Sequence, residues 1–119
     1  MLSKKNRADK KTIERIFREG LFVSSPNLTF KFIKTNDNKK QISFITPKTA
    51  SKKAVFRNLL RRRGYFVLRN YFNKLPNGLL GAFVFGKKSN GIFGGKKNKT
   101  HNPIANLDNE IKIILNKIN

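Results

Sequence analysis

The segment after Asp9 carries the spacing of a short amphipathic helix. Ile13, Ile16 and Phe17 stand at i, i+3 and i+4 and therefore share one helical face. Asp9 precedes them as an N-cap, and Gly20 follows as a stop. A helix of about three turns is marginal in water, so its apolar stripe must pack on another element, most simply a β-sheet.

Two segments with period-two alternation come next. Apolar residues occupy every second position over 28–33 and again over 41–46, which predicts two strands. A polar turn at 35–40 separates them and favours their pairing as a hairpin. A short additional strand around Phe22 is compatible with the same pattern.

The longest helical stretch runs from residue 50 or 51 to about residue 72, with Ser51 as the candidate N-cap. At about 100° per residue, polar and apolar side chains fall on opposite sides of this helix. The polar side holds Lys53, Arg57, Asn58, Arg61, Arg62, Tyr65 and Arg69. The apolar side, expected in the core, holds Val55, Phe56, Leu59, Leu60, Phe66 and Val67. Gly64 weakens the helix by about 1 kcal/mol relative to alanine, and the sequence alone offers no reason for it.

The last third of the chain predicts a strand, a loop and a helix. Residues 79–85 are apolar on both faces, as in a central strand, and they follow a crossover helix, which predicts parallel pairing with an earlier strand. Residues 86–102 are rich in glycine and lysine and are expected to form a mobile basic loop. Asn102 and Pro103 begin a final helix over 103–118.

These elements predict a single domain over residues 1–119 that begins with a basic stretch at 1–8. Their order is helix, strand, strand, helix, strand, helix. The expected fold class is α/β, more closely an α+β two-layer sandwich in which a basic crossover helix packs on a mixed sheet.

The charge of the chain limits the classes of partner that the protein can bind. Lysine and arginine number 27 against 6 aspartates and glutamates, so the formal net charge is +21. No carboxylate occurs between residues 38 and 107. Such self-repulsion opposes folding unless a polyanion neutralises it, and nucleic acid is the cellular polyanion with a defined surface. An anionic membrane is a weaker alternative because no broad apolar helix face with a basic rim is evident.

Several chemistries are excluded by composition. The chain has no cysteine and one histidine, His101, which rules out disulfides, thiol nucleophiles, Cys/His zinc sites and histidine triads. His101 lies in the expected loop without an evident orienting partner, and the few carboxylates are scattered, so we expect no catalytic residue and no protein metal site. The N-terminus shows no secretory signal and no segment is long enough to span a bilayer, so we expect a cytoplasmic protein.

One local motif is specific. Residues 53–58 read Lys-Ala-Val-Phe-Arg-Asn, and Leu-Arg-Arg follows at 60–62. This resembles the signature helix of the protein component of bacterial ribonuclease P, whose usual pattern is K-A-V-x-R-N-R-x-K-R-x-x-R-E. A basic stretch ending at Arg7 and a first helix ending F-x-x-G are similar to that family as well. Leu59 replaces the second arginine of the R-N-R triplet, Tyr65-Phe66 replaces the later Arg-Glu pair, and Arg63 is positioned to supply the missing charge.

The resemblance implies a subunit of an RNA-based endonuclease. Its partner would be the ribonuclease P catalytic RNA, which removes the 5′ leader of precursor transfer RNA with Mg²⁺ held mainly by the RNA, and no protein oligomer is expected. The resemblance and the basic helix together predict RNA contacts at Lys53, Arg57, Asn58, Arg61, Arg62, Arg63, Tyr65, Arg69 and Arg7. The rival interpretation is a small structural RNA-binding protein of the ribosomal type, which charge and size fit equally well.

The resemblance also implies a second surface for the single-stranded leader, on the sheet face beside the first helix. Its expected residues are Ile13, Phe17, Thr29 and Lys31. Ile13 and Phe17 would suit the core almost equally well. Thr29 and Lys31 alternate with apolar neighbours, so this polar set must face away from the main core.

Overall fold

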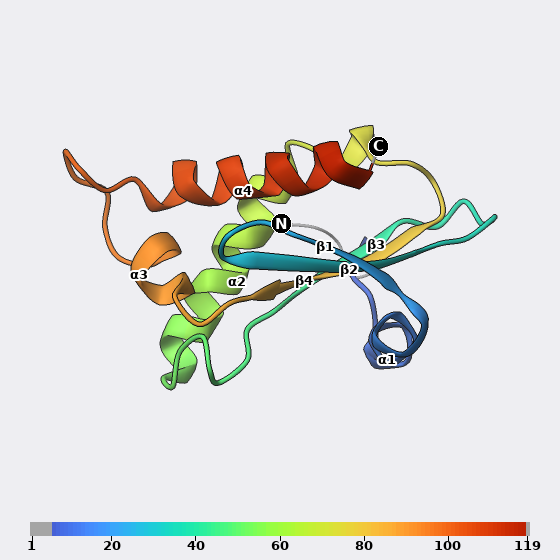
Figure 1. Cartoon of the computed structure of the whole chain (residues 1–119), viewed down its shortest axis with the longest axis horizontal. Helices are drawn as coiled ribbons and strands as arrows, with labels where there is room; N and C mark the ends of the chain where they lie inside the picture. Colours follow the sequence, from blue (N-terminus) through green and yellow to red (C-terminus); the bar gives the residue numbers. More distant parts are fainter. Residues whose placement is uncertain (1–5, 119) are drawn as a thin grey trace.

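The computed structural model describes residues 6–118 (Figure 1). Its elements are α1 (Lys10–Glu19), β1 (Leu21–Ser24), β2 (Leu28–Lys34), β3 (Gln41–Ile45), α2 (Ala54–Leu68), the 3-10 turn η2 (Phe72–Lys74), β4 (Leu79–Phe85), α3 (Ser89–Phe93) and α4 (Pro103–Ile118). The predicted α+β class, element order and mixed sheet are confirmed, and so is the short strand around Phe22.

The sheet order is β1-β2-β4-β3, in which β4 runs antiparallel to β2 and parallel to β3. The parallel pairing was predicted, but the hairpin between β2 and β3 was wrong, because β4 lies between them. The polar turn instead encloses the start of β4: the Thr35 N–H donates to the Gly78 carbonyl at 2.8 Å, and the Gly78 N–H donates to that of Lys39 at 2.9 Å. A turn can close on a distant segment, and local sequence does not reveal this.

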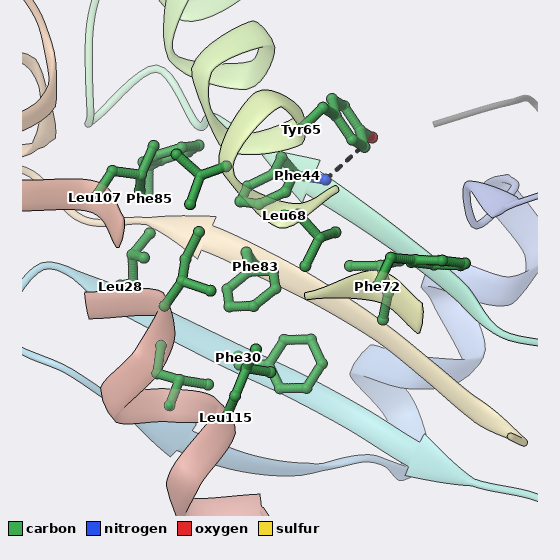
Figure 2. Close-up of a cluster of buried hydrophobic side chains, with 14 of the residues drawn as sticks. Leu28, Phe30, Phe44, Tyr65, Leu68, Phe72, Phe83, Phe85, Leu107 and Leu115 are labelled. Atoms are coloured by element: carbon green, nitrogen blue, oxygen red, sulfur yellow. Dashed lines mark hydrogen bonds between the residues drawn. The ribbon is translucent and has the colours of Figure 1, made fainter. Parts of the chain in front are cut away.

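The two sheet faces differ. Helices α2 and α4 cover one face, and α1 lies against the other (Figure 1). The covered face carries a phenylalanine cluster in which the Phe83 ring lies 4.4 Å from that of Phe30 and 4.8 Å from that of Phe44, measured between centroids (Figure 2). Ile16 is the buried residue of the apolar stripe of α1, which lies against the opposite face, as expected for a short helix that needs a sheet.

Helix α2 is shorter than predicted and turned differently. It begins after Lys53, and the predicted N-cap Ser51 forms no side-chain cap. Of the expected core residues, Val55, Phe56 and Phe66 are exposed and Leu59 is half-buried, whereas Leu60 and Val67 are buried. Leu68, which was not expected in the core, is also buried. Tyr65, predicted on the RNA-facing side, is buried as well.

Gly64 explains this rotation. A Cβ at Gly64 would lie 2.5 Å from the Phe44 ring, so only glycine lets α2 approach β3 at this point. The buried line of the helix consequently passes through Gly64 and its neighbours one turn away, Leu60 and Leu68.

The predicted loop at 86–102 contains a helix that the sequence analysis missed. Ser89 and Phe93 of α3 are buried, and the Phe93 ring packs edge-on against Phe85 at 5.9 Å. His101, expected without a partner, forms a 2.8 Å hydrogen bond between its Nε2 and the Gly94 carbonyl. Residues 95–100 form the longest continuously exposed run of this segment. The prediction of a mobile loop was therefore wrong over α3, which buried Phe93 and hydrogen bonds from Arg63 hold against the rest of the fold.

Candidate nucleic-acid interface

The exposed side of α2 forms the first candidate surface. One helical turn separates Asn58 from Arg61 and Arg62, so their side chains neighbour one another, and Arg61 donates to the Asn58 side-chain oxygen. Arg7 approaches them from the N-terminal segment. The hollow that they share has a volume of about 410 Å³ and is lined by Arg7, Val55, Asn58, Arg61, Arg62 and Tyr65. The structure thus brings five of the predicted RNA contacts together, Tyr65 among them.

Carboxylates do not neutralise this surface. The cations that form ion pairs among residues 6–118 are Arg15, Arg18 and Lys112, none of which belongs to α2. Elsewhere, Asp9 caps α1, where a hydrogen bond from the Thr12 N–H holds the pKa of its carboxyl below the usual value. The positive charge of α2 is therefore available to an external anion.

Two predicted RNA-binding arginines also have structural partners. Arg57 donates to the carbonyls of Ser51 at 3.0 Å and Lys52 at 2.8 Å, which fixes the entry to α2. Arg63 donates to the carbonyls of Phe93 at 2.6 Å and Gly95 at 2.7 Å, and burial together with neighbouring Arg62 lowers its pKa. These side chains support the fold as well as adding charge.

Tyr65 belongs to the core rather than to the open basic face. Its hydroxyl accepts the Phe44 N–H at 3.2 Å (Figure 2), and the guanidinium of Arg7 lies 5.8 Å from its ring centroid. Lys53 and Arg69 are exposed, and each lies over an exposed phenylalanine: Lys53 over Phe56 at 5.7 Å and Arg69 over Phe66 at 4.7 Å. Sequence periodicity missed these aromatic neighbours because it assigned both rings to the core.

The second candidate surface is the sheet face beside α1. Thr29 and Lys31 point to this face, as the alternation of β2 predicted. The Lys31 ammonium lies 4.8 Å from the ring centroid of Phe17, which is 43% exposed and thus not a core residue. Ile13 is half-buried and lines a hollow of about 430 Å³ together with Arg7, Ala8, Asp9, Ser43, Phe44 and Tyr65.

Phe22 is a further residue of this face that the sequence analysis did not assign to it. It pairs with Lys31 across β1 and β2, so the two side chains stand on the same face, and it is 69% exposed. Lys31 therefore stands next to two exposed aromatic residues, Phe17 and Phe22. In the sequence, the available signal for this surface was the aromatic residue Phe22 in the short strand predicted after the first helix.

The described residues show neither a metal site nor a membrane span. Over residues 6–118, no three histidine, cysteine, aspartate or glutamate side chains are grouped as a metal would require. No helix in this part of the chain is long and apolar enough to cross a membrane.

Comparison with known proteins identifies the family. The family model for ribonuclease P matches residues 2–119. The ribonuclease P protein of Thermotoga maritima has the same fold, with a TM-score of 0.78 and 18% identity over 95% of this chain and 97% of that one. A Staphylococcus aureus ribonuclease P protein mutant with defective mRNA degradation activity gives a TM-score of 0.77 and 13% identity over 97% and 89% of the two chains. No curated protein matches the sequence. Since the family match covers nearly the whole length, the chain belongs to the ribonuclease P protein family, the protein subunits of an RNA-containing enzyme of transfer RNA processing.

Proposed function

We propose that this subunit binds the ribonuclease P RNA through the exposed side of α2 and holds the 5′ leader of precursor transfer RNA on the sheet face beside α1. Arg7 lines both hollows, one at each surface, and so connects the two sites. The protein would act where precursor transfer RNA is made, in the cytoplasm. No observation favours the ribosomal-protein alternative.

The position of Lys31 carries the proposal for the leader. Single-stranded RNA is bound by aromatic side chains that stack on bases and by cations that contact phosphates. Lys31 supplies a cation beside Phe17 and Phe22, and the neighbouring Ser24 and Thr29 hydroxyls lie 3.3 Å apart on the same face. This face suits a short unpaired strand better than a duplex, whose bases are already stacked.

The cleavage chemistry would belong to the RNA and its bound Mg²⁺. In support, four of the six carboxylates are engaged within the protein, in a helix cap, in ion pairs or in hydrogen bonds. Glu110, for example, is buried and accepts hydrogen bonds from Ser25 and Asn27. Mg²⁺ ions bound through phosphates can activate water without protein ligands. Purified protein without RNA should therefore leave precursor transfer RNA intact. Metal-dependent cleavage that survives nuclease treatment of the protein would contradict this assignment.

The leader site is tested by comparing precursor with mature transfer RNA in the assembled holoenzyme. Lys31→Ala and Phe22→Leu should weaken the binding of the precursor more than that of the mature product, because only the precursor carries a leader. Lys112→Ala, which removes one positive charge from α4 on the other side of the sheet, is the matched control and should not discriminate between the two RNAs. Equal losses for both substrates would place the leader elsewhere.

A further inference from the structure

Phe66 is an aromatic residue that the core does not explain. It is 48% exposed on α2, although its neighbours Val67 and Leu68 are buried. In the ribonuclease P pattern quoted above this position is a glutamate, so the substitution replaces a negative charge with an exposed ring. A large exposed apolar side chain among charged neighbours is a feature of interaction sites.

Phe66 lines a groove between α2 and the beginning of α4. The groove has a volume of about 580 Å³ and is lined by Arg63, Phe66, Val67, Asn70, Lys97, Asn102, Pro103, Ile104, Ala105 and Asp108. Arg63 helps to shape it, because its hydrogen bonds to the Phe93 and Gly95 carbonyls hold the segment that precedes Lys97.

The charges around the ring are mainly positive. The Arg69 guanidinium lies 4.7 Å from the Phe66 ring centroid, and Arg63 and Lys97 lie along the groove. Asp108 is the one carboxylate that lines it, and this group already accepts the Tyr71 hydroxyl at 2.6 Å and pairs with Lys112 at 3.3 Å. The groove therefore combines an accessible aromatic ring with uncompensated cations.

We propose that this groove binds an unpaired nucleotide of the ribonuclease P RNA. The base stacks on Phe66, and Arg69 and Lys97 contact the adjoining phosphates. Unpaired nucleotides suit this arrangement because they expose the face of the base, and cations beside the ring favour the phosphate backbone. The inference rests on the proposed function, in which α2 faces the RNA subunit.

The position of the groove separates it from the leader site. Helices α2 and α4 cover one face of the sheet, whereas α1 lies on the other (Figure 1). Lys31 is on the α1 side, where its ammonium lies 4.8 Å from the ring centroid of Phe17. A leader held beside Lys31 does not occupy a groove between α2 and α4. The nucleotide is therefore assigned to the RNA subunit.

A tryptophan reporter tests the stacking directly. The chain contains no tryptophan, so Phe66→Trp introduces a single indole that can be excited apart from the two tyrosines. Its emission should be quenched when the protein is titrated with ribonuclease P RNA, because a stacked base quenches an indole. Ile113→Trp is the matched control: Ile113 is 41% exposed on α4 and does not line the groove, so emission there should change little.

Affinity measurements separate stacking from charge. Phe66→Leu should weaken binding of the RNA subunit about 5- to 150-fold, the range reported for losing one aromatic stack, whereas Phe66→Trp retains binding. The dependence of log K on log salt should keep its slope in Phe66→Leu, since no cation is lost. Arg62→Gln should instead reduce that slope by about one.

The outcomes distinguish the groove from the wider proposal. If Arg62→Gln weakens binding but Phe66→Leu does not and the tryptophan is unquenched, the groove assignment is wrong while RNA binding by α2 stands. If both substitutions leave RNA affinity unchanged, the proposed role of α2 itself fails. If Phe66→Leu weakens only binding of leader-carrying precursor to the holoenzyme, the nucleotide comes from the leader, and its assignment to the RNA subunit is overturned.

Discussion

At Gly64 the absence of a side chain determines how closely α2 approaches the sheet. The site of a Cβ lies 2.5 Å from the Phe44 ring, and Phe44 is itself held between Phe83 and Tyr65. The packing against Phe44 therefore requires glycine at this position, although glycine lowers the stability of the helix. Helix propensity and tertiary contact act in opposite directions at this residue.

Gly64→Ala should lower the free energy of unfolding by up to about 2 kcal/mol, because the overpacking cost of about 1–3 kcal/mol exceeds the gain of about 1 kcal/mol in helix propensity. Thermal or denaturant unfolding measures the change. Gly91→Ala in α3 is the control, since no atom lies within 4 Å of its Cβ position and the substitution should be neutral or stabilising. A stabilised Gly64→Ala protein would show that α2 can shift at little cost.

The environment of Tyr71 predicts that the stability of the fold changes with pH in the alkaline range. Burial and the hydrogen bond to Asp108 raise the pKa of Tyr71 from 10.0 to about 12. As pH rises, the unfolded chain loses this proton first, so the contribution to folding is complete below about pH 10 and is lost as pH approaches about 12. The stability difference between the native protein and Tyr71→Phe should shrink between pH 9 and pH 11.5. Parallel stability curves for the two proteins would contradict the assignment.

At the scale of elements, α2 and α3 depend on each other. Helix α3 has five residues, too few to be stable alone, and it is held by buried Phe93 and by the two hydrogen bonds from Arg63. The basic side of α2 thus contains residues with different roles: Arg62 is exposed, whereas Arg63 joins two elements.

Arg63→Ala should uncouple α3 from α2. The free energy of unfolding should fall by about 1–3 kcal/mol, the range expected for losing hydrogen bonds from a charged group. Amide hydrogen exchange should also accelerate around Phe93 and Gly95. Arg62→Ala is the matched control, because Arg62 forms no hydrogen bond with another residue of the described chain and should leave exchange in α3 unchanged. Unchanged exchange in Arg63→Ala would mean that Phe93 alone anchors the segment.

At the scale of the whole molecule, positive charge remains exposed because the carboxylates are few and most of them are already engaged. Glu19 pairs with Arg15, Asp108 with Lys112, and buried Glu110 ties α4 to the turn between β1 and β2. The side chains that carry the net charge of +21 therefore face mainly solvent. The phosphates of an RNA partner offset this self-repulsion, and the release of the RNA's condensed counterions favours binding.

RNA affinity should consequently depend steeply on salt. If roughly 6–10 phosphates are neutralised, the association constant should fall about 10³- to 10⁵-fold between 50 and 200 mM monovalent salt, by analogy with duplex DNA. Filter binding of the ribonuclease P RNA at several salt concentrations measures this slope. A nearly flat dependence would mean that the charge does not drive binding.

Local sequence determined most of the elements, including the basic helix and the polar alternation of β2, because helical and strand periodicities are set by neighbouring residues. It also placed Thr29 and Lys31 on the correct face. The signature at 53–62 indicated the family that the whole-chain match then established.

Tertiary structure decided the relations between distant segments. The insertion of β4 between β2 and β3, the rotation of α2 about Gly64 and the anchoring of α3 by Arg63 all depend on contacts across the fold. Exposure of Phe66 follows from that rotation, since periodicity defines an apolar side but not the point where a helix comes closest to a sheet. That point depends on which side chains fill the space between the two elements, and in this protein Phe44 fills it.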